Sequence, residues 1–310
     1  TTLAALGFAP STADPSLFLR TDTSLPPFYV LVYVDDLIFA TADTEALTLV
    51  RSELQKRHTC TDLGELRSYL GLQITRDRAW RTITLTQSHM VHQVLQRFGF
   101  QFSSPQPTPL SISHSLSAPP SDESIEPSGP YPELVGCLMY LMTCTRPDLA
   151  YPLNLLARYV ASDRHRKVHW DAAKRVLRYL CSTLGMGLVL GGRGPVVLTG
   201  HADASWELRW LTYLLTDLGE QPRSPPFLYV DNKAMIALCQ EHRLEHRTKH
   251  IALRYFLTRE LQQHGHLRLA YMATRANTAD IFTKALPPGD HQRFSTVLGL
   301  VPTLPHSLTT

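Results

Sequence analysis

The run FYVLVYVDDLIFA, residues 28–40, constrains the fold most, because it is apolar or aromatic everywhere except at Asp35 and Asp36. Short apolar runs of this kind are typical of buried strands, so we expect two short strands around a turn. Asp is common in turns. A tight hairpin turn, however, favours Gly or Asn with polar flanks, whereas the neighbours here are Val34 and Leu37. The doublet is therefore either a plain turn or a site for chemistry.

A bound cation is the second interpretation of the doublet. Two adjacent carboxylates in an apolar setting repel each other, and one is pushed towards protonation. Mg²⁺ removes this difficulty, since it takes hard oxygen ligands and is typically held by one or two carboxylates plus substrate phosphates. Two such ions can clamp the attacking and leaving oxygens of a phosphoryl transfer. The pattern favours a Mg²⁺ site at Asp35 and Asp36.

The segment 103–130 divides the chain. It holds nine Ser, seven Pro and one Gly among its 28 residues. Such a composition cannot bury enough apolar surface to offset the entropy that is lost on ordering. We expect a linker or a long surface loop. Around it, periodicity and stop signals predict a helix over 43–57, a hairpin over 70–87, and helices over 88–98, 131–145 and 164–181, with a boundary at the glycines of 185–194.

The block 195–300 alternates strand and helix signals and suits a small α/β layer domain, although its three expected strands are few. Asp203 ends the first strand, Asp231 ends the second, and Asp280 starts a short helix. Ligands of open α/β sheets bind at the carboxyl ends of strands, so these acids could converge on a metal. The alternative is helix capping for Asp231 and Asp280, and a strand-end turn for Asp203.

Basic residues gather in two segments of a chain whose net charge is only +3. Segment 164–178 has six Lys or Arg and one Asp, and segment 241–259 has five and two Glu. They favour local contact with phosphates, or else they are solvated helix faces. His242, His246 and His250 repeat at helical spacing, which would suit zinc, but no Cys or acid is placed to complete the site. Phosphate contact or a surface role is the alternative.

Several classes of protein are disfavoured by the sequence. The apolar runs are too short for a transmembrane helix, and no signal peptide is visible. The five cysteines contain no CxxC pair, which argues against a zinc ribbon or a disulfide framework and favours a reducing compartment. Because the chain does not begin with Met, we expect a piece of a longer protein.

The motifs together resemble a known family. FYVLVYVDDLIFA resembles the catalytic hairpin of reverse transcriptases, with YVDD as the signature. DLGELRSYLGLQI, LTQSHMVHQVLQRFGF and YPELVGCLMYLMTCTRPDLAY follow in the order seen in the copia-type retrotransposon polyprotein. YVDNKAMIALC, RTKHIALRYF and NTADIFTKALP resemble the ribonuclease H domain of that family. The resemblance covers nearly the whole chain.

The resemblance implies an α+β fold class: a partial reverse-transcriptase palm and a helical thumb-like region, followed by a truncated ribonuclease H-like α/β domain. The expected boundaries are 1–102 for the palm, 103–130 for the Ser/Pro-rich linker, 131–192 for the thumb or connection, 195–300 for the ribonuclease H-like domain and 301–310 for a tail.

The implied function is RNA-directed DNA polymerase and RNA–DNA hybrid ribonuclease, with RNA and DNA template-primer as substrates and Mg²⁺ as the metal. The rest of the polyprotein is the implied partner, no membrane is expected, and the location is cytoplasmic, in virus-like particles, or nuclear. The resemblance assigns metal binding and catalysis to Asp35, Asp36, Asp203, Asp231 and Asp280, and it places Lys249 and His250 near the ribonuclease H site. Nucleic-acid contact is expected of these two residues and Arg247, and of Lys167, Lys174 and Arg178, which project from one face of the helix 164–181 where they could reach a phosphate backbone.

Two departures from the family weaken this expectation. The third polymerase carboxylate of the family lies upstream, yet the 27 residues before Phe28 hold only Asp14 and Asp22. Trp206 is followed directly by ELRWLTYLLTDLG, so a strand pair and the fourth ribonuclease H acid are missing, and Glu207 is in the wrong register to replace it. We therefore expect no activity from residues 1–310 alone. The alternative is a non-catalytic nucleic-acid-binding relic or domesticated protein.

Overall fold

The computed structural model describes residues 2–112, 116, 129–161, 166–201, 205–220, 224–240 and 252–303. The chain forms two compact units. The first unit combines Thr1–Leu66 with Gly194–Asn277, and the second combines Arg67–Arg193 with Thr278–Thr310. The segment 103–130 falls within the range Arg67–Arg193 of the second unit, and the domain boundaries expected from the sequence stay a prediction.

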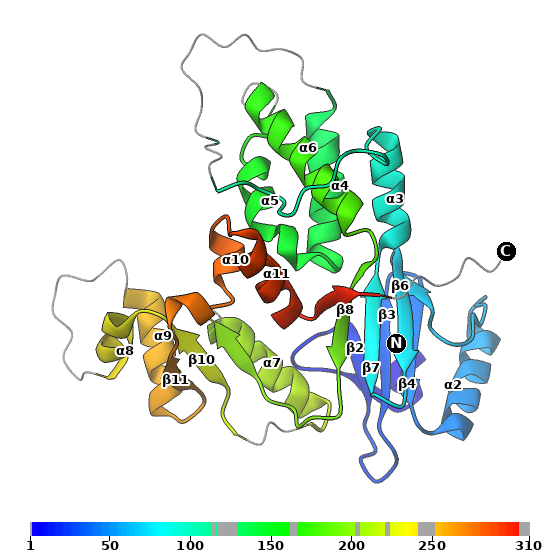
Figure 1. Ribbon diagram of the computed structural model, residues 1–310. Helices are drawn as coiled ribbons and strands as arrows, with labels where there is room; N and C mark the ends of the chain where they lie inside the picture. Colours follow the sequence, from blue (N-terminus) through cyan, green and yellow to red (C-terminus); the bar gives the residue numbers. More distant parts are fainter. Residues whose placement is uncertain are drawn as a thin grey trace. The chain divides into compact units, whose positions relative to one another are not determined.

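An antiparallel sheet opens the first unit, with its strands in sequence order (Figure 1). The expected strand pair of 28–40 is confirmed, and so is the helix expected over 43–57, where Asp43 accepts a capping hydrogen bond from the N–H of Ala46. The elements are α1 (Thr2–Ala5), β1 (Phe8–Pro10), β2 (Leu17–Arg20), β3 (Phe28–Tyr33), β4 (Asp36–Thr41) and α2 (Thr44–Arg57).

One face of this sheet packs on α2. Phe28 and Val30 of β3 are buried against Val50 and Leu54 of the helix. Directly opposite residues of an antiparallel pair share a face, and Val30 pairs with Phe39, so both point into this core. Tyr29 lies on the other face, where its hydroxyl donates to the backbone oxygen of Leu218.

A parallel three-stranded sheet in the order β11-β10-β9 forms the rest of the first unit. It agrees with the three strands that the sequence predicts. The core between sheet and helices includes Leu208, Leu228 and Leu261. The elements are β9 (Thr199–His201), α7 (Ser205–Asp217), β10 (Phe227–Val230), α8 (Lys233–Gln240), α9 (Ala252–Gln263), β11 (Arg268–Tyr271) and η3 (Thr274–Ala276).

The second unit contains a five-stranded antiparallel sheet in the order β12-β8-β7-β6-β5. The hairpin expected over 70–87 is confirmed, and its two strands lie next to each other in the interior of this sheet. The glycine stretch 185–194 was expected to be a boundary, and the first unit does resume at Gly194. Before that point the stretch forms a strand, Met186–Gly191, in which a Cβ at Gly187 would meet the methyl groups of Thr86 and Thr303. The strands are β5 (Ser68–Tyr69), β6 (Leu72–Asp77), β7 (Thr82–Thr86), β8 (Met186–Gly191) and β12 (Leu300–Pro302).

Helices make up the remainder of the second unit (Figure 1). Their core is dominated by fully buried leucines, among them Leu138, Leu153 and Leu177, as the predicted helical periodicity requires. The helices are α3 (Ser88–Arg97), α4 (Tyr131–Cys144), η1 (Pro147–Leu149), α5 (Ala150–Ala157), α6 (Lys167–Ser182), α10 (Asp280–Thr283) and α11 (Pro288–Val297).

The described part of the Ser/Pro-rich segment packs on these helices. Leu110 and Leu116 enter the helical core, and the hydroxyl of Thr108 accepts a hydrogen bond from Arg175. The expectation of a surface loop is wrong for these residues, because two leucines in the polar run have enough apolar surface to be drawn into the core. The fold as a whole is mixed α and β, compatible with a reverse-transcriptase-like chain. Among the described residues, no helix combines the length and apolar character needed to cross a membrane.

Candidate functional site

The carboxylate doublet lies at the tip of the β3–β4 hairpin. Tyr33 pairs with Asp36, so Val34 and Asp35 form a two-residue turn. Val34 adopts φ = 52°, which is a left-handed conformation that is rare for a β-branched residue. Strained backbone of this kind clusters at functional sites. The doublet therefore lies at a hairpin turn, and its role as a metal site stays a prediction.

The doublet is exposed, which corrects the expected apolar setting. Asp35 and Asp36 both reach solvent, and the neighbouring Val34 is 82% exposed. The run 28–40 is buried only at its start, where Phe28 and Val30 contact α2. The apolar surroundings that would disfavour two adjacent charges are therefore absent, and a cation or a polymer can reach both carboxylates directly.

The two acids upstream of the hairpin have local partners. Asp14 accepts a hydrogen bond from the N–H of Ser16. Asp22 accepts from the hydroxyl and the N–H of Ser24, and the side-chain hydrogen bond is the main reason that its pKa is lowered. Both acids therefore stabilise turns of the chain.

Two carboxylates are a suitable but incomplete ligand set for Mg²⁺. Their oxygens are the donors that this ion prefers. In the part of the chain that the structure describes, no three His, Cys, Asp or Glu side chains are grouped so that they could hold a metal ion. The two hairpin acids by themselves therefore form only part of such a ligand set.

The three acids expected in the second sheet do not form one described group. Asp231 follows β10 directly and is half-buried. Asp280 is the first residue of α10 in the second unit, where its carboxylate forms an ion pair with Lys284 at 2.7 Å. Asp203 lies outside the described residues, as do Arg247, Lys249 and all three histidines of the 242–250 stripe.

The predicted basic face of α6 is only partly free for ligands. Lys167 is exposed in the first turn of the helix. Lys174 forms an ion pair with Asp171 of the same helix. The guanidinium of Arg178 lies 5.8 Å from the centre of the Phe100 ring. Their role in nucleic-acid contact stays a prediction.

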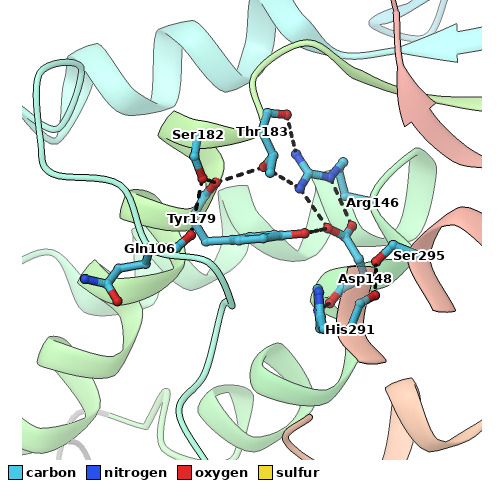
Figure 2. Close-up of polar contacts among 8 residues, drawn as sticks. All are labelled: Gln106, Arg146, Asp148, Tyr179, Ser182, Thr183, His291 and Ser295. Atoms are coloured by element: carbon cyan, nitrogen blue, oxygen red, sulfur yellow. Dashed lines mark hydrogen bonds and ion pairs between the residues drawn. The ribbon is translucent and has the colours of Figure 1, made fainter. Parts of the chain in front are cut away.

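A buried polar network, which the sequence did not reveal, lies in the second unit (Figure 2). Arg146 donates from Nε and Nη2 to the two carboxylate oxygens of Asp148, at 3.0 and 2.8 Å. The Tyr179 hydroxyl donates to Asp148 at 2.6 Å, and Arg146 also donates to Thr183. The side chains of Arg146 and Asp148 are 2% and 0% exposed. One hint of this network stands in the sequence: the tripeptide Arg146-Pro147-Asp148 directly follows the apolar helix expected over 131–145.

The electrostatics of this network favour the ion pair. Burial by itself would raise the pKa of Asp148, but the charge and hydrogen bonds of Arg146 outweigh it and hold that pKa below its ordinary value. Burial raises the pKa of Tyr179, and the Asp148 charge adds to this effect. Burial lowers the pKa of His291, whose Nε2 lies 3.2 Å from the backbone oxygen of Asp148. Since the network is closed to solvent, its role is structural.

Comparison with known proteins shows what the chain is similar to. Residues 1–112 match the family described as "Reverse transcriptase (RNA-dependent DNA polymerase)". The Pol polyprotein from transposon RE2 of Arabidopsis thaliana is 31% identical over 97% of this chain and 24% of its own length. The chain derives from a retrotransposon Pol polyprotein. A second relative, the Pol polyprotein from transposon TNT 1-94 of Nicotiana tabacum, is 28% identical over 93% of this Pol-derived chain and 26% of the relative.

A third relative matches a smaller share of this chain but a larger share of its own length. The putative transposon Ty5-1 protein of Saccharomyces cerevisiae is 33% identical over 66% of this chain and 65% of its own length. The Pol-derived chain spans about a quarter of the length of the RE2 and TNT 1-94 polyproteins. No solved structure matches it. The resemblance to a copia-type polyprotein is confirmed, and so is a polymerase origin for the first part of the chain.

Proposed function

We propose that this Pol-derived chain belongs to the RNA-directed DNA polymerase and ribonuclease H part of the polyprotein. There it acts on RNA–DNA template-primer, and residues 1–310 alone catalyse neither reaction. One observation carries the proposal: Asp35 and Asp36 stand exposed on a strained hairpin turn, while Asp14 and Asp22 are engaged in other turns.

The hairpin acids would hold Mg²⁺ in the complete enzyme. The ion neutralises charge on the phosphates of an incoming nucleotide when it is bound. The contribution of this chain is to present the two carboxylates at the tip of the β3–β4 hairpin, which is part of a four-stranded sheet. Positioning supplies most of the catalysis in phosphoryl transfer, so two acids without a third are expected to position the ion poorly.

The ribonuclease H part of the proposal rests on Asp203, Asp231 and Asp280. It is supported by the parallel sheet, because Asp231 directly follows the carboxyl end of β10. The ion pair between Asp280 and Lys284 reduces the negative charge available for a metal. Hybrid cleavage by residues 1–310 is therefore expected to be absent. Location in cytoplasmic virus-like particles or in the nucleus belongs to the same proposal.

Two assays test the proposal. Primer extension on an RNA template and cleavage of an RNA–DNA hybrid are measured with Mg²⁺ for residues 1–310. We expect no product in either assay. Nucleotide incorporation that disappears in Asp35→Asn but persists in Asp290→Asn, an exposed acid paired with Arg293, would overturn the claim that the chain alone is inactive.

Non-catalytic nucleic-acid binding is the second candidate function. It is favoured by Lys167, which is exposed on α6. Phosphate contacts release counterions, so hybrid binding is expected to weaken as salt increases. Lys167→Ala is expected to reduce the slope of log affinity against log salt by the share of about one phosphate contact. Binding that does not change with salt contradicts this function.

A further inference from the structure

Two half-buried arginines of α6 lie on one side of the helix. Arg175 and Arg178 are three residues apart, a spacing at which helical side chains are neighbours. Burial lowers the pKa of Arg175, and the nearby charge of Arg178 lowers it further. The ion pairs among the described residues include neither guanidinium, and Nε of Arg175 has no hydrogen-bond partner among them. This side of α6 can therefore accept an anion.

Both arginines contact the start of the Ser/Pro-rich segment. The guanidinium of Arg178 lies 5.8 Å from the centre of the Phe100 ring. The N–H of Gln106 donates to the backbone oxygen of Arg178 at 3.3 Å. Nη2 of Arg175 donates to the hydroxyl of Thr108 at 3.1 Å. The stretch 100–108 is thus held against α6 at three points.

Ser104 lies between these contact points. It follows Phe100 and precedes Gln106 by two residues. Two residues of chain span at most about 7 Å. Because an arginine side chain is long and Gln106 touches the backbone of Arg178, a charged group on Ser104 comes within reach of the Arg178 guanidinium.

The hydroxyls of this stretch differ in their accessibility. Ser104 and Thr108 each precede a proline, which favours extended backbone at both positions. Thr108 is buried, and its hydroxyl donates to the backbone oxygen of Leu110 at 3.0 Å. The hydroxyl of Ser103 donates to the backbone oxygen of Phe100. Ser104 is exposed, outside any helix or strand. It is therefore the hydroxyl before a proline that an enzyme can reach here.

A phosphate group on this serine fits the two arginines. Phosphorylation adds nearly two negative charges and three acceptor oxygens to a serine. Arginine pairs with phosphate through two parallel N–H groups. The stretch 100–108 contains no Asp or Glu, so without modification it offers the arginines no charge. A loop that only connects two helices does not require a pair of arginines beneath it.

We propose that Ser104 is a phosphorylation site and that its phosphate pairs with Arg178 and Arg175. A proline-directed protein kinase transfers the γ-phosphoryl group of ATP to Oγ of Ser104. The bond between that phosphorus and ADP breaks, the Oγ–P bond forms, and the hydroxyl proton passes to the kinase. The modified stretch is then tied to α6 by charge as well as by its present contacts. The inference goes beyond the proposed function and does not rest on it.

The first experiment asks which hydroxyl is modified. Residues 1–310 are incubated with ATP and a purified proline-directed kinase, and phosphopeptides are mapped by mass spectrometry. We expect phosphate on Ser104 and none on Thr108, because Thr108 is buried. Ser104→Ala is expected to leave this stretch unmodified, whereas Thr108→Val is expected to retain the modification. Absence of phosphate on Ser104 overturns the inference.

The second experiment measures what the phosphate does. Phosphoserine is incorporated at position 104 during synthesis, and urea unfolding of this protein is compared with that of the unmodified protein. We expect the ratio of folded to unfolded protein to increase about tenfold, the scale of one hydrogen bond to a charged group. Arg178→Gln is expected to remove most of this increase. Lys167→Gln is the matched control, because Lys167 is exposed on the same helix but lies about 16 Å from Arg178 along its axis.

Phosphorus NMR gives a readout that needs no variant. Pairing with arginine favours the doubly charged phosphate, so its second pKa, ordinarily about 6, is expected to be lower in the native protein than in urea. Equal values in the two states overturn the pairing. A folded-to-unfolded ratio that the phosphate leaves unchanged or decreases does the same, and so does an equal loss in Lys167→Gln. Each readout is independent of primer extension and hybrid cleavage.

Discussion

The two units use carboxylates in opposite ways. Asp148 of the second unit is completely buried, and Arg146 and Tyr179 satisfy both of its oxygens. Asp35 and Asp36 of the first unit stand exposed on a hairpin turn. In the sequence both sets have apolar neighbours, since Asp148 precedes Leu149 and Asp36 precedes Leu37.

This comparison shows that apolar neighbours in the sequence are not enough to bury an acidic side chain. A buried carboxylate needs a partner charge and hydrogen bonds, or its desolvation destabilises the fold. Asp148 finds its partner two residues away and its third hydrogen bond on another helix. The hairpin acids sit where a strand pair ends, and a turn points its residues to solvent. A buried acid of this kind supports stability, whereas an exposed doublet is available for binding.

The largest expected effect comes from breaking the buried pair. Asp148→Asn leaves the charge of Arg146 buried without its counter-ion, and such changes cost about 3–5 kcal/mol. Urea unfolding measures the loss. Asp290→Asn, in an exposed pair with Arg293, is the control and is expected to lose less than about 1 kcal/mol. Equal losses in the two variants would contradict the comparison.

Removing one hydrogen bond from the network is expected to have a smaller effect. Tyr179→Phe keeps the ring but removes the donor to Asp148, and a hydrogen bond to a charged group is worth about 1.5–3 kcal/mol. Tyr140→Phe removes a hydroxyl that donates to Leu70 at an exposed site and is expected to lose less. Chemical unfolding measures both losses: the midpoint is expected to decrease more in Tyr179→Phe than in Tyr140→Phe, and the reverse order would contradict the prediction.

The strained turn of the first unit can be relaxed. Val34→Gly removes the left-handed strain of about 1–2 kcal/mol, and the added freedom of the unfolded chain offsets part of the gain. We expect a net stabilisation of about 1 kcal/mol or less. Val197→Gly, at an exposed valine without a positive φ, is expected to give no gain. A loss of stability in Val34→Gly would show that the turn is unstrained.

The network is also expected to respond to pH through His291, which faces Asp148, Arg146 and the ring of Tyr179. Burial lowers the pKa of His291 from its ordinary value of 6.5. The unfolded chain therefore takes up the proton first, so stability is complete above pH 6.5 and falls as the pH decreases below it.

His291→Gln tests this pH dependence, since glutamine retains an N–H donor but does not titrate. Thermal unfolding between about pH 7.5 and 5.5, around the ordinary pKa of histidine, is expected to show a flatter profile in the variant. His92→Gln, at an exposed histidine of α3, should leave the profile unchanged. The interpretation fails when the profile of His291→Gln follows that of the unchanged protein.

The smallest effect is expected at the exposed doublet. Asp36→Asn changes an exposed side chain, and such substitutions usually alter stability by no more than about 0.5 kcal/mol. Thermal unfolding without divalent cations measures this change. A loss comparable to that of Asp148→Asn would show that Asp36 supports the fold, and the contrast between the two units would disappear.

Local patterns in the sequence predicted much of the secondary structure. The helices α2, α3, α4 and α6 were predicted because their apolar residues repeat at helical spacing, as Val91, Val94 and Leu95 do in α3. The β6–β7 hairpin was predicted from alternation around a polar turn. The short elements were missed: β12 has three residues and is formed by pairing with β8, in which Leu300 meets Leu188. Such a strand carries no local signal.

The site was predictable only in part. YVDD marked the hairpin and placed the chain near the reverse transcriptases, but its exposure was not predicted. The buried role of Asp148 depends on Tyr179 of α6 and His291 of α11, which are distant in sequence. The place of Ser104 near Arg178 likewise depends on Phe100 and Gln106 meeting α6.

The sequence by itself determined the family and the main helices and hairpins, since these follow from spacing and motifs along short stretches. Only the tertiary structure decided which carboxylates are buried, that two leucines draw a Ser/Pro-rich segment onto the helical core, and that a glycine-rich stretch becomes a strand. The physical reason is that burial of a charge or of an apolar side chain depends on partners from distant segments, and a local pattern does not contain them.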